Sequence, residues 1–157
     1  MKKLAVKILI CSTTCLLLGI ASGYSTAGAI KNWYQYIVKP DWNPPNWLFG
    51  PVWTILYLLM GVSLALVWHK ALVLPKKALI LFIIQFILNL LWSYIFFNKQ
   101  QIGYAFVEIA CMLLFIVLTT ISFYRINKTA AYLMLPYLFW VCFATVLNGT
   151  IWYLNKS

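Results

Sequence analysis

Five long apolar stretches divide the chain, and charged residues lie almost only between them. Each stretch has about 20 residues or more, the length that an α-helix needs to cross the hydrocarbon core of a membrane. The apolar residues run continuously instead of alternating with polar ones, which favours helices over the strands of a membrane barrel. The pattern predicts an all-α membrane protein, a five-transmembrane-helix bundle, with spans at about residues 8–30, 47–68, 78–97, 102–124 and 130–154.

The first stretch has a second interpretation. Lys2, Lys3 and Lys7 precede it, and the small residues 27–29 resemble a signal-peptidase site, as in a cleaved secretory leader. The stretch is long for the core of such a leader, so a retained helix is favoured. The residues alone leave both interpretations open.

Composition and charge support the membrane assignment. Of the 157 residues, 64% are hydrophobic and 9% charged, which excludes an ordinary soluble domain, a disordered chain and a small disulfide-stapled module. The net charge of +10 comes from residues that flank the apolar stretches, so a membrane surface is the expected partner and nucleic acid is not. More Lys and Arg lie on the side of Lys2 than on the side of Lys31, which predicts a cytoplasmic N-terminus.

The connections indicate a single domain over residues 1–157. Three of them are short, so successive helices are expected to be antiparallel neighbours. The connection at residues 31–46 is long and rich in proline and aromatic residues. Because proline fixes φ and aromatic rings add apolar surface, we expect this loop to fold down as a lid.

Few residues offer reactive chemistry. The four cysteines all lie within predicted spans with no ligand set around them, so neither a disulfide nor a metal site is predicted. Glu108 is the only acid inside a span; with no second embedded charge beside it, a structural role is favoured over proton pumping. Small residues from Gly19 to Thr26 in the first span are expected to serve close helix packing, within the bundle or at a dimer interface.

Three spans each carry one face of aromatic, amide and small residues. Helical spacing places them together, as in the set Gln85, Asn89, Trp92 and Ser93; the set Tyr137, Trp140, Ala144 and Asn148; and the set Trp53, Tyr57 and Gly61. Polar groups in a span usually face the bundle interior, and aromatic walls with few polar groups are typical of a small-molecule site. Hydrogen bonding between helices explains the same pattern, so both interpretations stay open.

Several motifs together resemble the TspO/MBR family of tryptophan-rich sensory proteins and translocator proteins. They are KPDWNPPNW at residues 39–47, GPVWT at 50–54, the third-span residues Gln85, Asn89, Trp92 and Ser93, and LPY at 135–137. The resemblance covers nearly the whole chain. It implies five retained helices, often a homodimer, in what is here expected to be a bacterial cell membrane. It also implies binding of porphyrins and other hydrophobic molecules as ligands, with no cofactor.

The resemblance and the shared helix faces together give the candidate ligand-binding residues: Trp53, Trp140, Asn89, Ala144, Tyr34, Pro44, Tyr57, Tyr137 and Trp92. Indole offers a flat surface for stacking on a tetrapyrrole. Lys31 and Lys39 are candidates for pairing with propionates, although solvated charge explains them equally well. Haem ligation is not expected, because the sole histidine, His69, lies at the opposite end of its span.

The predicted function is that of a membrane receptor or sensor for porphyrins, linked to tetrapyrrole homeostasis or stress. Two alternatives remain at this point. One is a light-dependent porphyrin-degrading enzyme in which Trp53 and Trp140 act as redox partners. The other is a transporter of porphyrins or sterols, for which the internal repeat common in secondary carriers is not evident.

Overall fold

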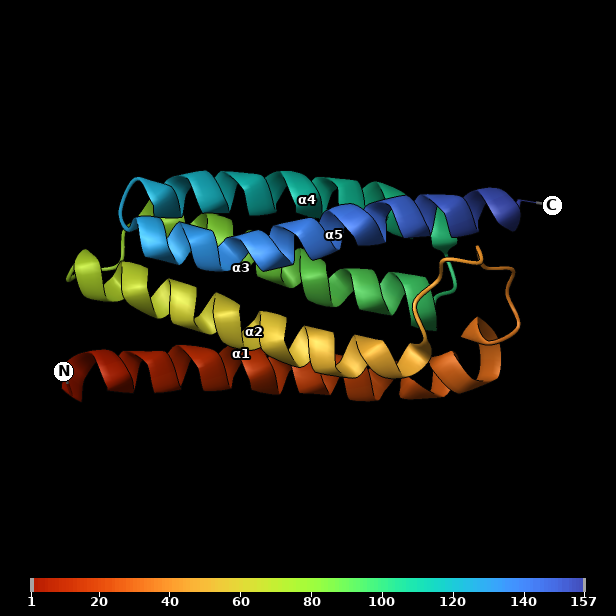
Figure 1. Ribbon diagram of the computed structural model, residues 1–157, viewed down its shortest axis with the longest axis horizontal. Helices are drawn as coiled ribbons and strands as arrows, with labels where there is room; N and C mark the ends of the chain where they lie inside the picture. Colours follow the sequence, from red (N-terminus) through yellow and green to blue (C-terminus); the bar gives the residue numbers. More distant parts are fainter. Residues whose placement is uncertain (1, 157) are drawn as a thin grey trace.

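The computed structural model describes residues 2–156 and confirms the predicted bundle of five membrane-length helices. Met1 and Ser157 of the predicted domain lie outside the described residues. The helices run side by side along the long axis of the molecule (Figure 1). They are α1 Lys2–Ala29, which continues as a π-helical turn η1 at Ile30–Tyr34; α2 Asn46–Lys70; α3 Lys76–Ser93, which continues as a π-helical turn η2 at Tyr94–Asn98; α4 Ile102–Tyr124; and α5 Lys128–Leu154.

The helix boundaries have local causes. Pro45 and Pro75 directly precede α2 and α3, and proline is disfavoured inside a helix but suits its beginning. Asn127 caps α5, because its side chain accepts a hydrogen bond from the Ala130 N–H at 3.2 Å. The observed helices match the predicted spans closely. The largest difference is α1, which begins at Lys2 instead of residue 8, and there the Lys7 ammonium donates to the Trp68 carbonyl at 3.1 Å.

The packing order leaves one region of the bundle loosely filled. α1 packs along α2, α2 along α5, α5 along α4, and α4 along α3. By contrast, α1 makes few contacts with α3 or with its continuation η2. The solid core lies away from this gap, around the fully buried residues Met60, Met112, Met134 and Tyr137.

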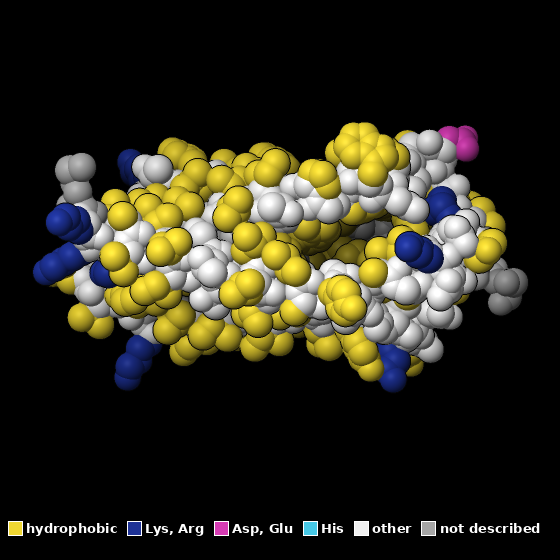
Figure 2. All heavy atoms as spheres, turned by 90° about the horizontal axis from the view of Figure 1, so that it is seen from below, with side chains coloured by type: hydrophobic (Ala, Val, Ile, Leu, Met, Phe, Trp, Pro, Cys, Tyr) yellow, Lys and Arg dark blue, Asp and Glu magenta, His cyan; other side chains and the backbone are white. Residues whose placement is uncertain are grey.

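The outer surface is that of a membrane protein. Large apolar side chains such as Leu9, Phe139 and Val146 are exposed along the helices, and hydrophobic atoms cover most of the face in Figure 2. On that face the Lys and Arg side chains lie toward the two ends of the molecule. An apolar belt between charged ends fits a bundle embedded in lipid.

Candidate functional site

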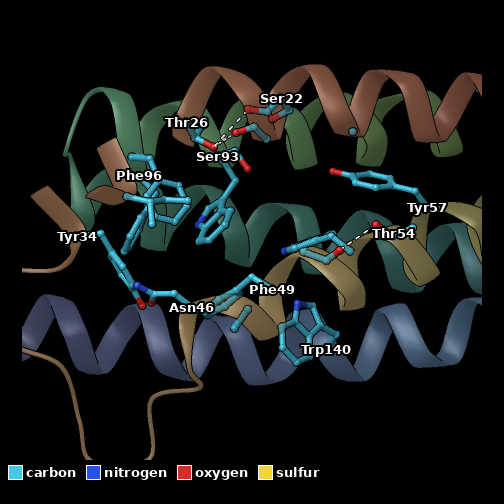
Figure 3. Close-up of a pocket in the computed structure, with 18 of the residues that line it drawn as sticks. Ser22, Thr26, Tyr34, Asn46, Phe49, Thr54, Tyr57, Ser93, Phe96 and Trp140 are labelled. Carbon is cyan, nitrogen blue, oxygen red and sulfur yellow. Dashed lines mark hydrogen bonds between the residues drawn. The ribbon is translucent and has the colours of Figure 1, made fainter. Parts of the chain in front are cut away.

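A cavity of about 380 Å³ lies between α1, α2, α3 and α5, at the end of the bundle that carries the long loop. This volume falls within the range of about 300–1,000 Å³ typical of ligand sites. A hollow opens near this end on the face shown in Figure 2. Figure 3 shows the lining side chains, which converge from several helices.

Six of the predicted ligand-binding residues line this cavity. They are Tyr34 from η1, Trp53 and Tyr57 from α2, Trp92 from α3, and Trp140 and Ala144 from α5. The Trp53 and Tyr57 rings lie 5.6 Å apart, and the Trp140 ring lies 6.1 Å from that of Phe49. Residues distant in sequence thus form one aromatic wall. Ligand binding by these residues stays a prediction.

Two further candidates lie behind the wall instead of on it. Asn89 is 1% exposed; its Oδ1 accepts from the Tyr57 hydroxyl at 2.7 Å, and its Nδ2 donates to the Tyr137 hydroxyl at 3.1 Å. Tyr137 is fully buried, and its hydroxyl donates to the Met112 sulfur at 3.7 Å. The placement of both residues on the cavity surface was therefore wrong, because helical spacing fixes the face of a residue but not its depth along the bundle. Asn89 holds the Tyr57 hydroxyl directly, whereas Tyr137 acts through Asn89 and packs edge-on against the Trp53 ring at 6.3 Å.

Pro44 does not line the cavity either. It lies in the loop that joins η1 to α2, and its carbonyl accepts a hydrogen bond from the Asn43 side chain at 2.9 Å. Asn43 also accepts from the Tyr34 hydroxyl at 2.8 Å. Pro44 is thus linked to the cavity residue Tyr34 through Asn43, and its role in ligand binding stays a prediction.

The loop contacts the bundle at two places, and its role as a lid stays a prediction. The Trp42 ring lies edge-on to the cavity residue Phe143, with ring centroids 5.8 Å apart. The Asn155 side chain, just beyond α5, accepts from the Val38 N–H at 3.1 Å and donates to the Val38 carbonyl at 2.9 Å. The loop is thus held at two places along the C-terminal part of α5, at Phe143 and just beyond the helix at Asn155.

Lys39 has a different role from the one that the sequence suggested. Its ammonium donates to the carbonyls of Tyr34 at 2.7 Å, Ile37 at 2.9 Å and Gln35 at 3.3 Å. An ammonium has three protons, so these bonds occupy all its donors. The partial burial of the group also lowers the pKa of Lys39. It therefore caps the carbonyl end of η1 and is not available for a propionate, whereas Lys31 is exposed.

The sequence assigned one cavity wall to helix packing. Gly19, Ser22, Gly23 and Thr26 of α1 all line the cavity. A Cβ at Gly19 would lie 2.2 Å from the Tyr57 ring, whereas a Cβ at Gly23 would meet nothing within 4 Å. Close packing within the bundle is thus seen at Gly19 but not at Gly23, where packing at a dimer interface stays a prediction. The sequence did not indicate four phenylalanines that also line the cavity, because only the fold distinguishes them from lipid-facing phenylalanines. They are Phe49, Phe96, Phe97 and Phe143.

The cavity holds hydroxyl, amide and aromatic groups but no charged side chain among its described lining residues. Within residues 2–156, no three His, Cys, Asp or Glu side chains are placed to share a metal ion. The carboxyl oxygens of Glu108 are buried without a hydrogen-bond partner, outside the cavity lining. The chemistry that this site offers is therefore stacking and neutral hydrogen bonding.

These features define an integral membrane protein with an aromatic, uncharged cavity of ligand size. A sequence model of the TspO/MBR family matches residues 11–154, so the chain belongs to this family. It is 44% identical to the tryptophan-rich protein TspO of Chlorobaculum tepidum, with 99% of each chain covered. It is 39% identical to the protein of the same name from Archaeoglobus fulgidus, over 89% of this chain and 91% of that one. It is also 39% identical to human translocator protein, over 76% of this chain and 73% of that one.

Proposed function

We propose that the protein is a membrane receptor or sensor that binds porphyrins and related flat hydrophobic molecules in this cavity. The observation that carries the proposal is the aromatic wall, in which Trp53, Trp92 and Trp140 border one uncharged space of about 380 Å³. Indole rings offer large flat faces to a planar macrocycle, and stacked aromatic pairs gain about 0.5–1.5 kcal/mol beyond area burial. The role in tetrapyrrole homeostasis or stress is part of the proposal.

The residues favour a porphyrin held as a ligand over one fixed through its metal. Haem iron takes His, Cys, Met or Tyr as its axial protein ligand. No His, Cys or Met is among the described lining residues, and the hydroxyls of Tyr34 and Tyr57 already donate to Asn43 and Asn89. Binding through the ring faces requires none of these groups.

Quenching of tryptophan fluorescence by protoporphyrin IX tests the proposal. The full chain, purified in detergent, is titrated alongside the Trp140→Phe and Trp47→Phe variants. Trp140 lines the cavity, whereas Trp47 is 71% exposed and does not. We expect saturable quenching with a higher Kd for Trp140→Phe and an unchanged Kd for Trp47→Phe. Equal affinities in all three proteins would refute the cavity as the binding site.

We also propose that the cavity faces away from the cytoplasm, in a bacterial cell membrane. The N-terminus, the α2–α3 connection and the α4–α5 connection lie at one end of the bundle, and the long loop lies at the other (Figure 1). The first end carries most of the Lys and Arg residues, which is typical of a cytoplasmic side. Thiol labelling of intact cells after Lys31→Cys checks this orientation. The homodimer that the resemblance implies belongs to the same proposal.

A further inference from the structure

The cavity has two chemically different sides. Ser22 and Thr26 of α1 and Ser93 of α3 lie together on one side, opposite Trp140 and Phe49 (Figure 3). Three hydroxyls from two helices therefore face an aromatic wall across the space that a flat ligand would fill.

Two of these hydroxyls have hydrogen-bonding capacity to spare. The Thr26 hydroxyl donates within α1, to the carbonyls of Gly23 at 3.0 Å and Ser22 at 3.3 Å. Between residues 2 and 156, no hydrogen bond joins the Ser22 or Ser93 hydroxyl to another protein group, although both side chains are partly buried. A hydroxyl that faces an apolar space gains free energy when a ligand supplies the missing partner.

The surroundings restrict what that partner is. No charged side chain is among the described lining residues, so a carboxylate placed here would lose its hydration without gaining a counter-charge. An uncharged carbonyl oxygen, as in an ester or amide, accepts hydrogen bonds at a much smaller desolvation cost.

We propose that Ser22 and Ser93 determine ligand specificity by donating hydrogen bonds to an uncharged carbonyl group on the edge of the flat ligand. This inference rests on the proposed function, since it concerns the same cavity. It adds that the aromatic wall favours flat ligands, whereas the Ser22 and Ser93 hydroxyls favour ligands that carry an uncharged hydrogen-bond acceptor.

Two porphyrins with the same macrocycle separate these contributions. Protoporphyrin IX dimethyl ester carries ester carbonyls, whereas octaethylporphyrin carries only alkyl groups. Each is titrated against the full chain in detergent and against the Ser22→Ala, Ser93→Ala and Ser25→Ala variants. Ser25 is the matched control, because it lies on α1, is exposed and does not line the cavity.

We expect Ser22→Ala and Ser93→Ala each to raise the Kd of the dimethyl ester by about two- to tenfold, the range for loss of one net hydrogen bond. The Kd of these two variants for octaethylporphyrin should equal that of the original chain. The Ser25→Ala variant should bind both porphyrins with the Kd values of the original chain. If both cavity variants bind the ester unchanged, or lose both porphyrins equally, the serine role is overturned and the proposed function stands. If the original chain binds protoporphyrin IX but neither of these porphyrins, this inference fails and the proposed function stands; if it binds none of the three, both fail.

Discussion

Replacing Gly19 with alanine tests how firmly the Tyr57 ring, which lines the cavity, is held in place. The added Cβ would lie 2.2 Å from Cε2, 2.4 Å from Cδ2 and 2.7 Å from Cζ of Tyr57. The Tyr57 ring is buried, and its hydroxyl donates to Asn89 at 2.7 Å, so it has little room to yield. Gly19→Ala must therefore push the ring into the cavity or move α1 away from α2.

Gly23→Ala supplies the reference for the magnitude. Gly23 lies one turn further along α1 and also lines the cavity, but a Cβ there meets nothing within 4 Å. Both substitutions gain the same helix propensity, about 0.8–1.0 kcal/mol for alanine over glycine in aqueous helices. The difference between them isolates the clash, and overpacking of a filled site costs about 1–3 kcal/mol. If the shift also breaks the bond to Asn89, the unpaired buried amide adds about 1–3 kcal/mol.

Denaturation by sodium dodecyl sulfate in mixed micelles, followed by circular dichroism, measures the free energy of unfolding of both variants. We expect Gly19→Ala to be less stable than Gly23→Ala by at least about 1 kcal/mol. We also expect weaker porphyrin binding in Gly19→Ala, because the displaced ring occupies cavity space. Equal stability and equal affinity of the two variants would show that the Tyr57 ring moves freely, and would refute the reasoning.

Three further predictions concern the wall, its support and the loop. Ala144→Leu fills cavity space and should abolish the saturable quenching by protoporphyrin IX while the helical circular dichroism spectrum stays unchanged. Asn89→Leu removes the acceptor of the Tyr57 hydroxyl, so the free energy of unfolding in mixed micelles should fall by about 1–3 kcal/mol; the Tyr137 hydroxyl loses one donor but keeps its bond to the Met112 sulfur. Lys39→Met uncaps the end of η1 and should speed proteolysis in the adjacent loop, whereas Lys31→Met, at an exposed position, should not; equal rates would contradict the capping role.

The helices were predictable because the membrane imposes strong rules on length and hydrophobicity. Of the site, the sequence indicated Trp53, Trp140 and Ala144, since aromatic and small residues recur at helical spacing. It misplaced Asn89, because spacing reveals the face of a helix and not what covers that face. It also misjudged Lys39, whose carbonyl partners are brought together only by the irregular turn after α1.

The small residues of α1 that line the cavity are a second case in which the sequence could not decide the role of a helix face. Small residues such as Gly23 and Ser22 fit close helix packing and an open cavity equally well, because both require the absence of bulk. The distinction depends on the opposite element. α1 packs closely on α2 but makes few contacts with α3, so the small residues face a space that no neighbouring helix fills.

Asparagine side chains explain how such a space stays open. Three aromatic residues of the cavity are tied at their polar atoms: Tyr34 to Asn43, Tyr57 to Asn89 and Trp92 to Asn148, at 2.7–3.0 Å. Each tie joins different elements or a helix to the loop, so the rings cannot collapse inward without losing a hydrogen bond.

Trp53 and Trp140 differ from these tied rings. Between residues 2 and 156, no hydrogen bond joins either indole N–H to another protein group, and both rings contact neighbouring aromatic rings edge-on or at a tilt. If the protein binds flat ligands as proposed, a frame of hydrogen-bonded rings lowers the ordering cost of binding, because only the two indoles without such a bond have to adapt to the ligand. The hydrogen-bonded rings thus maintain the volume of the cavity, and under the proposed function Trp53 and Trp140 are the indoles expected to adjust to flat molecules of different outline.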